Sequence, residues 1–262
     1  MIEMSENKGS FNLKVYRGDK NGQYFVEFEL DRKEGLNVIS ALMEVQKNPI
    51  TKSGERITPI VWEQACLEEV CGSCSMIING RPRQACTALV EEILKDDKTD
   101  TIILAPFTKF PLVRDLVVDR SSMFENLKKI KGWIPIEGYH SEDFASTVNP
   151  KQQEAMYVES TCMTCGCCLE ACPQFGPRSN FVGASTINQV KLFNANETGK
   201  SLKEERLTVM MEEGGVSDCG NAQNCVQVCP KKIPLTSSIA AIGKDVVKSY
   251  FNRKFGLSEH LD

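Results

Sequence analysis

The sequence predicts an α+β protein whose two halves are built differently. In roughly residues 1–106, apolar and polar residues alternate along short segments, which is the pattern of strands in a half-buried sheet. From about residue 151, apolar residues recur at intervals of three and four, which is typical of helices. A length of 262 residues suits two domains. We therefore expect one domain at 1–106, a helical connector at 107–150 and a helical domain at 151–262.

A β-hairpin is expected first. Apolar residues alternate with polar ones at 11–15 and again at 24–30, and a turn rich in Gly, Asp and Asn separates the two runs at 18–22. A helix should follow, because Asn37 suits its N-cap position and Asn48-Pro49 ends its apolar pattern. Further strands are expected at 75–78, 85–90 and 101–105.

The connector should begin as a helix at Phe110-Pro111 and continue as a Gly- and Pro-containing stretch at 131–150. The buried stripe of its helix would be Val117, Phe124, Leu127 and Ile130. After it, helices are expected at 152–160, 202–213 and 234–255, the last with Ile239, Ile242, Val246 and Tyr250 at helical intervals.

The chain contains twelve cysteines, and eleven of them fall into three sets. The first set has the spacing C-x4-C-x2-C-x11-C, the plant-type arrangement in which four thiolates hold a [2Fe-2S] cluster. Its members are Cys66, Cys71, Cys74 and Cys86. Gly72 lies between two of them, so the backbone can approach the cluster and offer its N–H to a sulfide. Strands around one helix, with this loop at a sheet edge, suit the β-grasp fold of plant-type ferredoxins.

The second set has the bacterial ferredoxin spacing C-x2-C-x2-C-x3-C-P, in which the fourth cysteine binds the other of two clusters. The third set would repeat this run, but its second cysteine is replaced by Ala222. Crossed ligation then gives a [4Fe-4S] cluster on Cys162, Cys165, Cys168 and Cys229, and leaves Cys172, Cys219 and Cys225 for the other.

A methyl group cannot coordinate iron, so the sequence predicts a [3Fe-4S] cluster opposite Ala222. A labile [4Fe-4S] cluster with water on its fourth iron is the alternative. Two such runs, each ending in Cys-Pro and each followed by a helix, predict an all-helical, bacterial-ferredoxin-like second domain.

Cys167 is left over and is expected to be a small buried thiol. Disulfides are not expected, because the first ten residues are polar and contain no apolar signal segment. Zinc in a non-redox interaction module is the stronger competitor, since zinc sites also use C-x2-C pairs. Three closely spaced thiolates with a trailing Cys-Pro are too crowded for one tetrahedral ion, which favours iron-sulfur clusters.

The overall composition excludes several classes of function. Net charge −4 gives no basic face for nucleic acid, and no apolar run approaches the roughly 20 residues that span a bilayer. The basic residues of 231–254 suit a solvated helix face. The two histidines, His140 and His260, lie far from the cysteine sets, so haem ligation by this chain is not expected.

In this order, the cysteine sets and their surroundings resemble the iron-sulfur subunits of succinate dehydrogenase and fumarate reductase over nearly the whole chain. Leu67, the Glu68-Glu69 pair and the Asn-rich stretch 219–225 resemble most the menaquinone-linked form of Gram-positive bacteria. The matching segments are Cys66–Cys74, Asn79-Gly80, Phe110-Pro111, Arg114–Leu116, Val118–Arg120, Cys162–Pro173 and Cys219–Pro230.

The resemblance implies an electron-transfer subunit without catalytic residues of its own. Electrons from succinate would pass from FAD on a partner flavoprotein through the [2Fe-2S], [4Fe-4S] and [3Fe-4S] clusters to a quinone at a membrane-anchor cytochrome b subunit. FAD, haem and quinone would belong to the partners. The same residues would serve a fumarate reductase working in reverse. The implied location is peripheral, on the cytoplasmic side of the cell membrane.

Two departures from the family limit this inference. Members that use ubiquinone have a Trp shortly after the Cys-Pro and a His after the first cysteine of the last run, where this chain has 174–177 and Gly220. We therefore assign no quinone-binding residue and expect menaquinone as the acceptor. Leu67 and Glu69 replace the common Arg and Gly of the first loop, which changes its charge but not its ligands.

Overall fold

The computed structural model describes residues 9–135 and 148–256. They divide into two compact units: Met1–Arg120 with Met163–Glu170, and Ser121–Cys162 with Ala171–Asp262. The segment Met163–Glu170 thus packs with the first unit although it lies in the second half of the sequence. The polar start of the chain, His140 and His260 lie outside the described residues.

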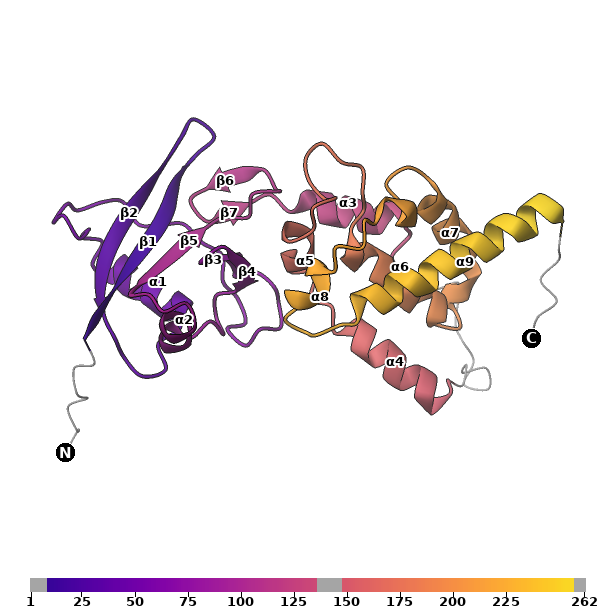
Figure 1. The fold of residues 1–262 in the computed structure, drawn as a ribbon, viewed down its shortest axis with the longest axis horizontal. Helices are drawn as coiled ribbons and strands as arrows, with labels where there is room; N and C mark the ends of the chain where they lie inside the picture. The colour runs from indigo at the N-terminus through magenta and orange to yellow at the C-terminus, as the bar shows by residue number, and fades with distance from the viewer. Residues whose placement is uncertain (1–8, 136–147, 257–262) are drawn as a thin grey trace. The chain divides into compact units, whose positions relative to one another are not determined.

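The first unit is built on a five-stranded mixed sheet with the order β2-β1-β5-β3-β4 (Figure 1). Strands β1 and β5 run parallel, and the other neighbouring strands are antiparallel. The strands are β1 (Ser10–Asp19), β2 (Gly22–Asp31), β3 (Ser75–Ile78), β4 (Arg81–Gln84) and β5 (Thr101–Ala105).

The predicted hairpin and first helix are confirmed. Strands β1 and β2 pair over ten residues each, and the side chains of Phe11, Leu13 and Val15 point into the core. Helix α1 (Val38–Lys47) begins where predicted, because the Asn37 side chain accepts a hydrogen bond from the Ser40 N–H at 2.8 Å. Its apolar face joins the strands in one core.

The predicted strand at 85–90 is wrong. The turn after β3 has φ values of 47° at Asn79 and 77° at Gly80, and such a two-residue turn returns the chain at once. The partner strand β4 therefore ends at Gln84, before the expected strand begins. Val90 instead opens a short helix that the sequence reasoning missed, α2 (Val90–Asp96).

The predicted helix from Phe110 is also wrong at its start. Residues 112–118 form a small hairpin of β6 (Leu112–Arg114) and β7 (Val117–Val118), and α3 begins only at Ser121 (Ser121–Lys129). Phe124 of the predicted stripe is 56% exposed, while Met123 and Ile130 are buried. The hairpin forms because Asp115, at φ 50°, turns its carboxylate into the unit and binds Arg17 at 3.2 Å.

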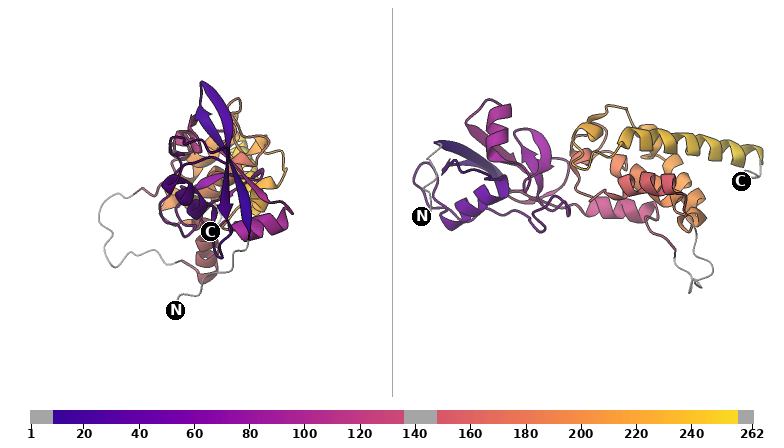
Figure 2. Two further views of the ribbon diagram at one scale, coloured as in Figure 1. Left: turned by 90° about the vertical axis from the view of Figure 1, so that its left-hand side faces the viewer. Right: turned by 90° about the horizontal axis from the view of Figure 1, so that it is seen from below.

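Helices make up the regular structure of the second unit in its described residues. Helices α6 and α9 pack along each other, as Figure 2 shows from below. The α-helices besides α3 are α4 (Pro150–Ser160), α6 (Ala184–Ala195), α7 (Lys203–Met211), α8 (Asn224–Gln227) and α9 (Leu235–Phe255). Two short 3-10 helices lie between them, η2 (Gly199–Leu202) and η3 (Val216–Asp218).

The three helices predicted for this half are confirmed within two residues at each end. Tyr250 is an exception to the predicted apolar face of α9, because it is 50% exposed while Ile242 is buried. The last turns of α9 pack through polar residues instead: Ser249 and Arg253 both bind Glu204 of α7. Across the described ranges, every helix is too short or too polar to cross a bilayer.

Candidate metal centres

The first cysteine loop wraps its backbone around sulfur. Positive φ angles at Leu67 (62°), Glu69 (55°) and Gly72 (74°) turn the chain three times between Cys66 and Cys74. As a result, the N–H groups of Glu68, Val70 and Cys71 donate to Cys66 Sγ at 3.3–3.4 Å. Such N–H donors are the kind of support that ligand sulfurs of an iron-sulfur cluster receive from the backbone.

The same loop prepares Cys71 for ligation. A hydrogen bond from the Ser73 side chain, together with backbone donors, lowers the pKa of the Cys71 thiol to about 6. The Ser73 N–H lies 3.5 Å from Cys71 Sγ. A thiolate is the form that binds metal, so this half of the loop is ready for a cationic group.

Cys74 and Cys86 form the buried half of the first set. The antiparallel pairing of Ser75 with Gln84 brings them together, and each is 4% exposed. Burial, with Cys86 close by, raises the pKa of the Cys74 thiol to about 12. Two buried sulfurs side by side repel each other as thiolates unless a cation lies between them. The chemistry of this pair therefore suits a group that contains positive iron ions.

Arg120 holds this loop in place. Its Nη1 donates to the Gly72 carbonyl at 2.8 Å, and its Nη2 donates to the Ser73 carbonyl at 3.2 Å and to Glu63. Gly72 also allows a close approach that no side chain would permit. A Cβ there would lie 2.9 Å from the Cα of Cys165, in the segment of the second cysteine run that packs in this unit.

That segment, Met163–Glu170, carries Cys165, Cys168 and the leftover Cys167, all buried, and ends as the short helix α5 (Cys167–Glu170). The carboxylate of Glu170 fastens it to the residues after β5. It accepts from Thr108 N at 3.0 Å, Thr108 Oγ1 at 2.6 Å and Lys109 N at 3.1 Å. The other two cysteines predicted for this set, Cys162 and Cys229, are half-buried and belong to the second unit.

The third set lies within the second unit. Burial raises the pKa of the Cys225 thiol above its ordinary value, and the neighbouring Cys172 and Cys219 raise it further. Both Cys172 and Cys219 are therefore near enough to influence Cys225, and their joint ligation stays a prediction. Ala222 lies on the exposed turn between Cys219 and Cys225, flanked by left-handed residues at 221 (φ 51°) and 223 (φ 62°).

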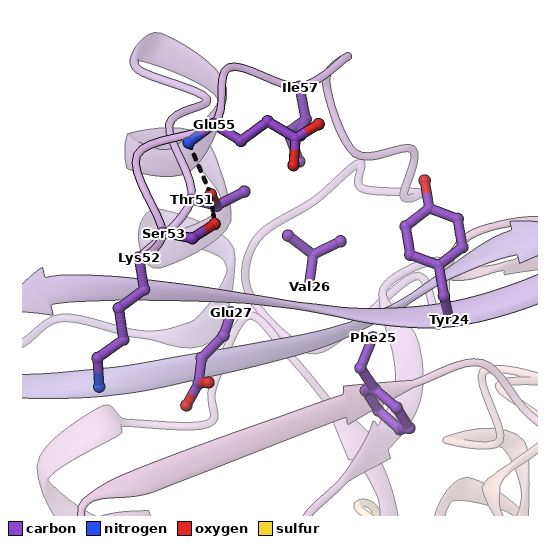
Figure 3. A pocket seen from close by; sticks show the side chains of 9 residues that line it. All are labelled: Tyr24, Phe25, Val26, Glu27, Thr51, Lys52, Ser53, Glu55 and Ile57. Atoms are coloured by element: carbon purple, nitrogen blue, oxygen red, sulfur yellow. Dashed lines mark hydrogen bonds between the residues drawn. The ribbon is translucent and has the colours of Figure 1, made fainter.

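In the described ranges, no three Cys, His, Asp or Glu side chains converge as the ligands of a single ion would. A cluster spreads its thiolates around several atoms and does not require such convergence. A cavity of about 640 Å³ between β2 and the 51–57 loop contains none of the cysteines (Figure 3). It is lined by Tyr24, Phe25, Val26, Glu27, Thr51, Lys52, Ser53, Glu55 and Ile57.

Sequence reasoning missed three polar residues that support the cysteines: Gln84, Arg120 and Glu170. Glu170 lies between two cysteines of the second run, so its position could have singled it out. Arg120 belongs to one of the segments that carry the resemblance, but no role was assigned to it. Gln84 gave no comparable signal, because it approaches the cysteines only through strand pairing.

Fold and site together define an iron-sulfur protein with two differently built cluster domains. The family described as "2Fe-2S iron-sulfur cluster binding domain" matches residues 12–125, and that described as "4Fe-4S dicluster domain" matches 159–233. Both matches confirm an α+β chain that carries [2Fe-2S] and [4Fe-4S] centres.

Similarity to known proteins narrows the class further. The chain is 52% identical over 233 residues to the succinate dehydrogenase iron-sulfur subunit of Bacillus subtilis, covering 89% of this chain and 90% of that one. It is 29% identical to the fumarate reductase iron-sulfur subunit of Wolinella succinogenes, covering 86% and 90%. The chain belongs to the family of iron-sulfur subunits of succinate dehydrogenase and fumarate reductase, whose role is electron transfer.

A solved structure has the same fold. A chain of the Mycobacterium smegmatis Sdh1 complex in the apo form superimposes with a TM-score of 0.72 at 20% identity, covering 92% of this chain and 97% of that chain. This likeness shows the fold, and the 52% identity to the Bacillus subtilis subunit confirms the family predicted from the sequence.

Proposed function

We propose that this chain carries electrons from FAD on a flavoprotein subunit to menaquinone at a membrane-anchor cytochrome b subunit, within a succinate dehydrogenase. Its clusters would supply one-electron acceptance and donation. The observation that carries the proposal is the combination of family membership with eleven cysteines in three ligand sets. The chain's own residues hold, shield and tune these groups, while the dicarboxylate chemistry lies in the partner.

The proposed ligands follow the cysteine sets. In this proposal a plant-type β-grasp domain at 1–106 binds [2Fe-2S], and a connector at 107–150 leads to a helical, bacterial-ferredoxin-like domain at 151–262 with the other two clusters. The ligands are Cys66, Cys71, Cys74 and Cys86 for [2Fe-2S]; Cys162, Cys165, Cys168 and Cys229 for [4Fe-4S]; and Cys172, Cys219 and Cys225 for [3Fe-4S].

The trinuclear assignment is supported by Ala222. Its methyl group stands where the third run would need a thiolate, and both Cys172 and Cys219 are near enough to Cys225 to raise the pKa of its thiol. EPR of the air-oxidised complex tests it. We expect the signal of an oxidised [3Fe-4S] cluster, and its absence would contradict the assignment.

The partners and location follow from family membership. A flavoprotein would supply FAD, and a membrane-anchor subunit would supply haem and the quinone site. The chain would then sit peripherally on the cytoplasmic side of the cell membrane. Menaquinone is favoured because Gly220 and 174–177 stand where the resemblance places the pocket residues of ubiquinone-linked members.

The function is tested with the intact complex purified from membranes. We expect the chain to copurify with a flavoprotein and a haem-containing subunit, to contain acid-labile sulfide, and to support succinate oxidation with a menaquinone analogue. A colourless complex that contains zinc and no sulfide would overturn the proposal. Turnover with ubiquinone alone would contradict only the choice of quinone.

Fumarate reduction is the second candidate, because the family also contains fumarate reductase subunits such as that of Wolinella succinogenes. The same ligands would serve either direction. Rates of succinate oxidation and fumarate reduction in the same isolated membranes decide between them.

A further inference from the structure

Gln84 is a buried polar side chain placed between two cysteines. It ends strand β4 and is 1% exposed. Its Oε1 lies 3.5 Å from Cys74 Sγ, and its Nε2 lies 3.4 Å from Cys167 Sγ and 2.8 Å from Ser75 Oγ. The hydrogen-bond partners of this buried amide are a hydroxyl and two sulfurs. They hold the amide in one place, because leaving a buried donor or acceptor unpaired costs free energy.

The two cysteines around Gln84 have different roles in the proposed function. Cys74 is a proposed ligand of the [2Fe-2S] cluster. Cys167 belongs to none of the ligand sets, yet it lies between Cys165 and Cys168, two proposed ligands of the [4Fe-4S] cluster. Gln84 therefore touches a ligand of one cluster and the immediate neighbour of ligands of the next.

Cluster binding decides which end of the amide faces Cys74. In the structure, Cys74 donates its S–H to Oε1 of Gln84. A thiolate ligand has no S–H, so Oε1 would then face a second acceptor. A half-turn of the amide exchanges the positions of its oxygen and nitrogen without moving other atoms. Nε2 then donates an N–H to the sulfur of Cys74.

The surrounding network accommodates the turned amide. The Ser75 hydroxyl now donates to the Gly72 carbonyl at 2.7 Å, but that carbonyl also accepts from Arg120 at 2.8 Å. The hydroxyl can therefore turn to donate to Oε1 of Gln84. The Gly72 carbonyl then still accepts a hydrogen bond from Arg120. The Sγ atom of Cys167 stays beside this end of the amide.

We propose that Gln84 is a positioning residue that donates a hydrogen bond to the sulfur of Cys74 and thereby raises the reduction potential of the [2Fe-2S] cluster, while the non-ligand Cys167 packs against the other end of its amide. The inference rests on the proposed ligand sets. Its physical basis is that hydrogen bonds to ligand sulfurs stabilise the more negative, reduced cluster.

The test is an EPR-monitored redox titration of the intact complex with Gln84→Leu, which keeps the bulk of the side chain and removes its N–H. We expect the [2Fe-2S] midpoint potential to become more negative and the [3Fe-4S] potential to stay unchanged. Thr87→Val is the matched control, because Thr87 lies beside Cys86 but bonds Glu69 and no sulfur. An unshifted [2Fe-2S] potential with an intact signal would overturn the proposal.

Two further variants keep the outcome decisive. If Gln84→Leu does not assemble, Gln84→Met removes the same donor with a flexible side chain, and the same comparison of potentials applies. Cys167→Ala should retain the full iron content, whereas loss of the [4Fe-4S] signal would make Cys167 a ligand and refute its role here. A wild-type complex without any [2Fe-2S] signal would instead refute the proposed function.

Discussion

Replacing Glu170 by alanine should destabilise the second cysteine run more than any surface change. Glu170 is 8% exposed, and its carboxylate accepts three hydrogen bonds, from Thr108 N, Thr108 Oγ1 and Lys109 N. A hydrogen bond to a charged group contributes about 1.5–3 kcal/mol, and bonds that share one acceptor are less than additive. We therefore expect Glu170→Ala to lower the free energy of unfolding by about 3–5 kcal/mol.

The loss of stability should affect helix α5 itself as well as the whole chain. Helix α5 carries Cys168 at its second position, and Glu170 is its tether to the residues after β5. Without it, the iron of the [4Fe-4S] centre should be released at lower urea concentration than the iron of the [2Fe-2S] centre. Thr108→Val removes only the hydroxyl donor and should cost about 1 kcal/mol.

Urea denaturation of the full chain, followed by circular dichroism and by visible absorbance, measures both effects. Glu125→Ala is the control, because Glu125 is an exposed carboxylate whose partner is Lys128 on the same helix. Its change should stay below about 0.5 kcal/mol. A loss of less than about 1 kcal/mol for Glu170→Ala would refute the view that this carboxylate fastens α5.

Three further changes test other parts of the structure. Asp115→Ala leaves the 2%-exposed Arg17 without its ion pair, so it should lower the free energy of unfolding in urea by about 3–5 kcal/mol. A loss below about 1 kcal/mol, the level of a surface pair, would contradict a stabilising role for this buried ion pair. Ala222→Cys should replace the [3Fe-4S] EPR signal of the oxidised complex by a [4Fe-4S] signal on reduction, and an unchanged spectrum would mean that residue 222 does not face the open corner. Gly72→Ala places a Cβ 2.9 Å from Cys165 Cα at φ 74°. It should lower the free energy of unfolding by about 2–4 kcal/mol and reduce the iron content. Unchanged stability and iron content would show that the loop relaxes freely.

The three cysteine runs could be recognised because the spacing within each run is local, whereas their ligation stays a prediction. The hairpin at the start and the cap at Asn37 were predictable for the same reason, since alternation and capping are local. The family was recognisable because three such local patterns occur in a fixed order.

One error came from a local turn, and another arose where a tertiary contact overrides a local pattern. The two-residue turn at Asn79 moved strand β4 ahead of its predicted place at 85–90. The pairing of Asp115 with Arg17, 98 residues apart, converts the predicted helix start into the β6-β7 hairpin. Nothing in the sequence near 110–118 records a partner that distant.

The same division separates the residues that bind clusters from those that tune them. A thiolate must be a cysteine, so ligands are fixed in type and spacing, and sequence alone exposes them. A tuning group needs only one N–H at the right place. Gln84, the positioning residue proposed above, reaches the first loop through strand pairing, and Arg120, which holds that loop, lies 48 residues from Gly72 in the sequence. Relatives that share all eleven cysteines can therefore differ at such positions and hold the same clusters at different potentials.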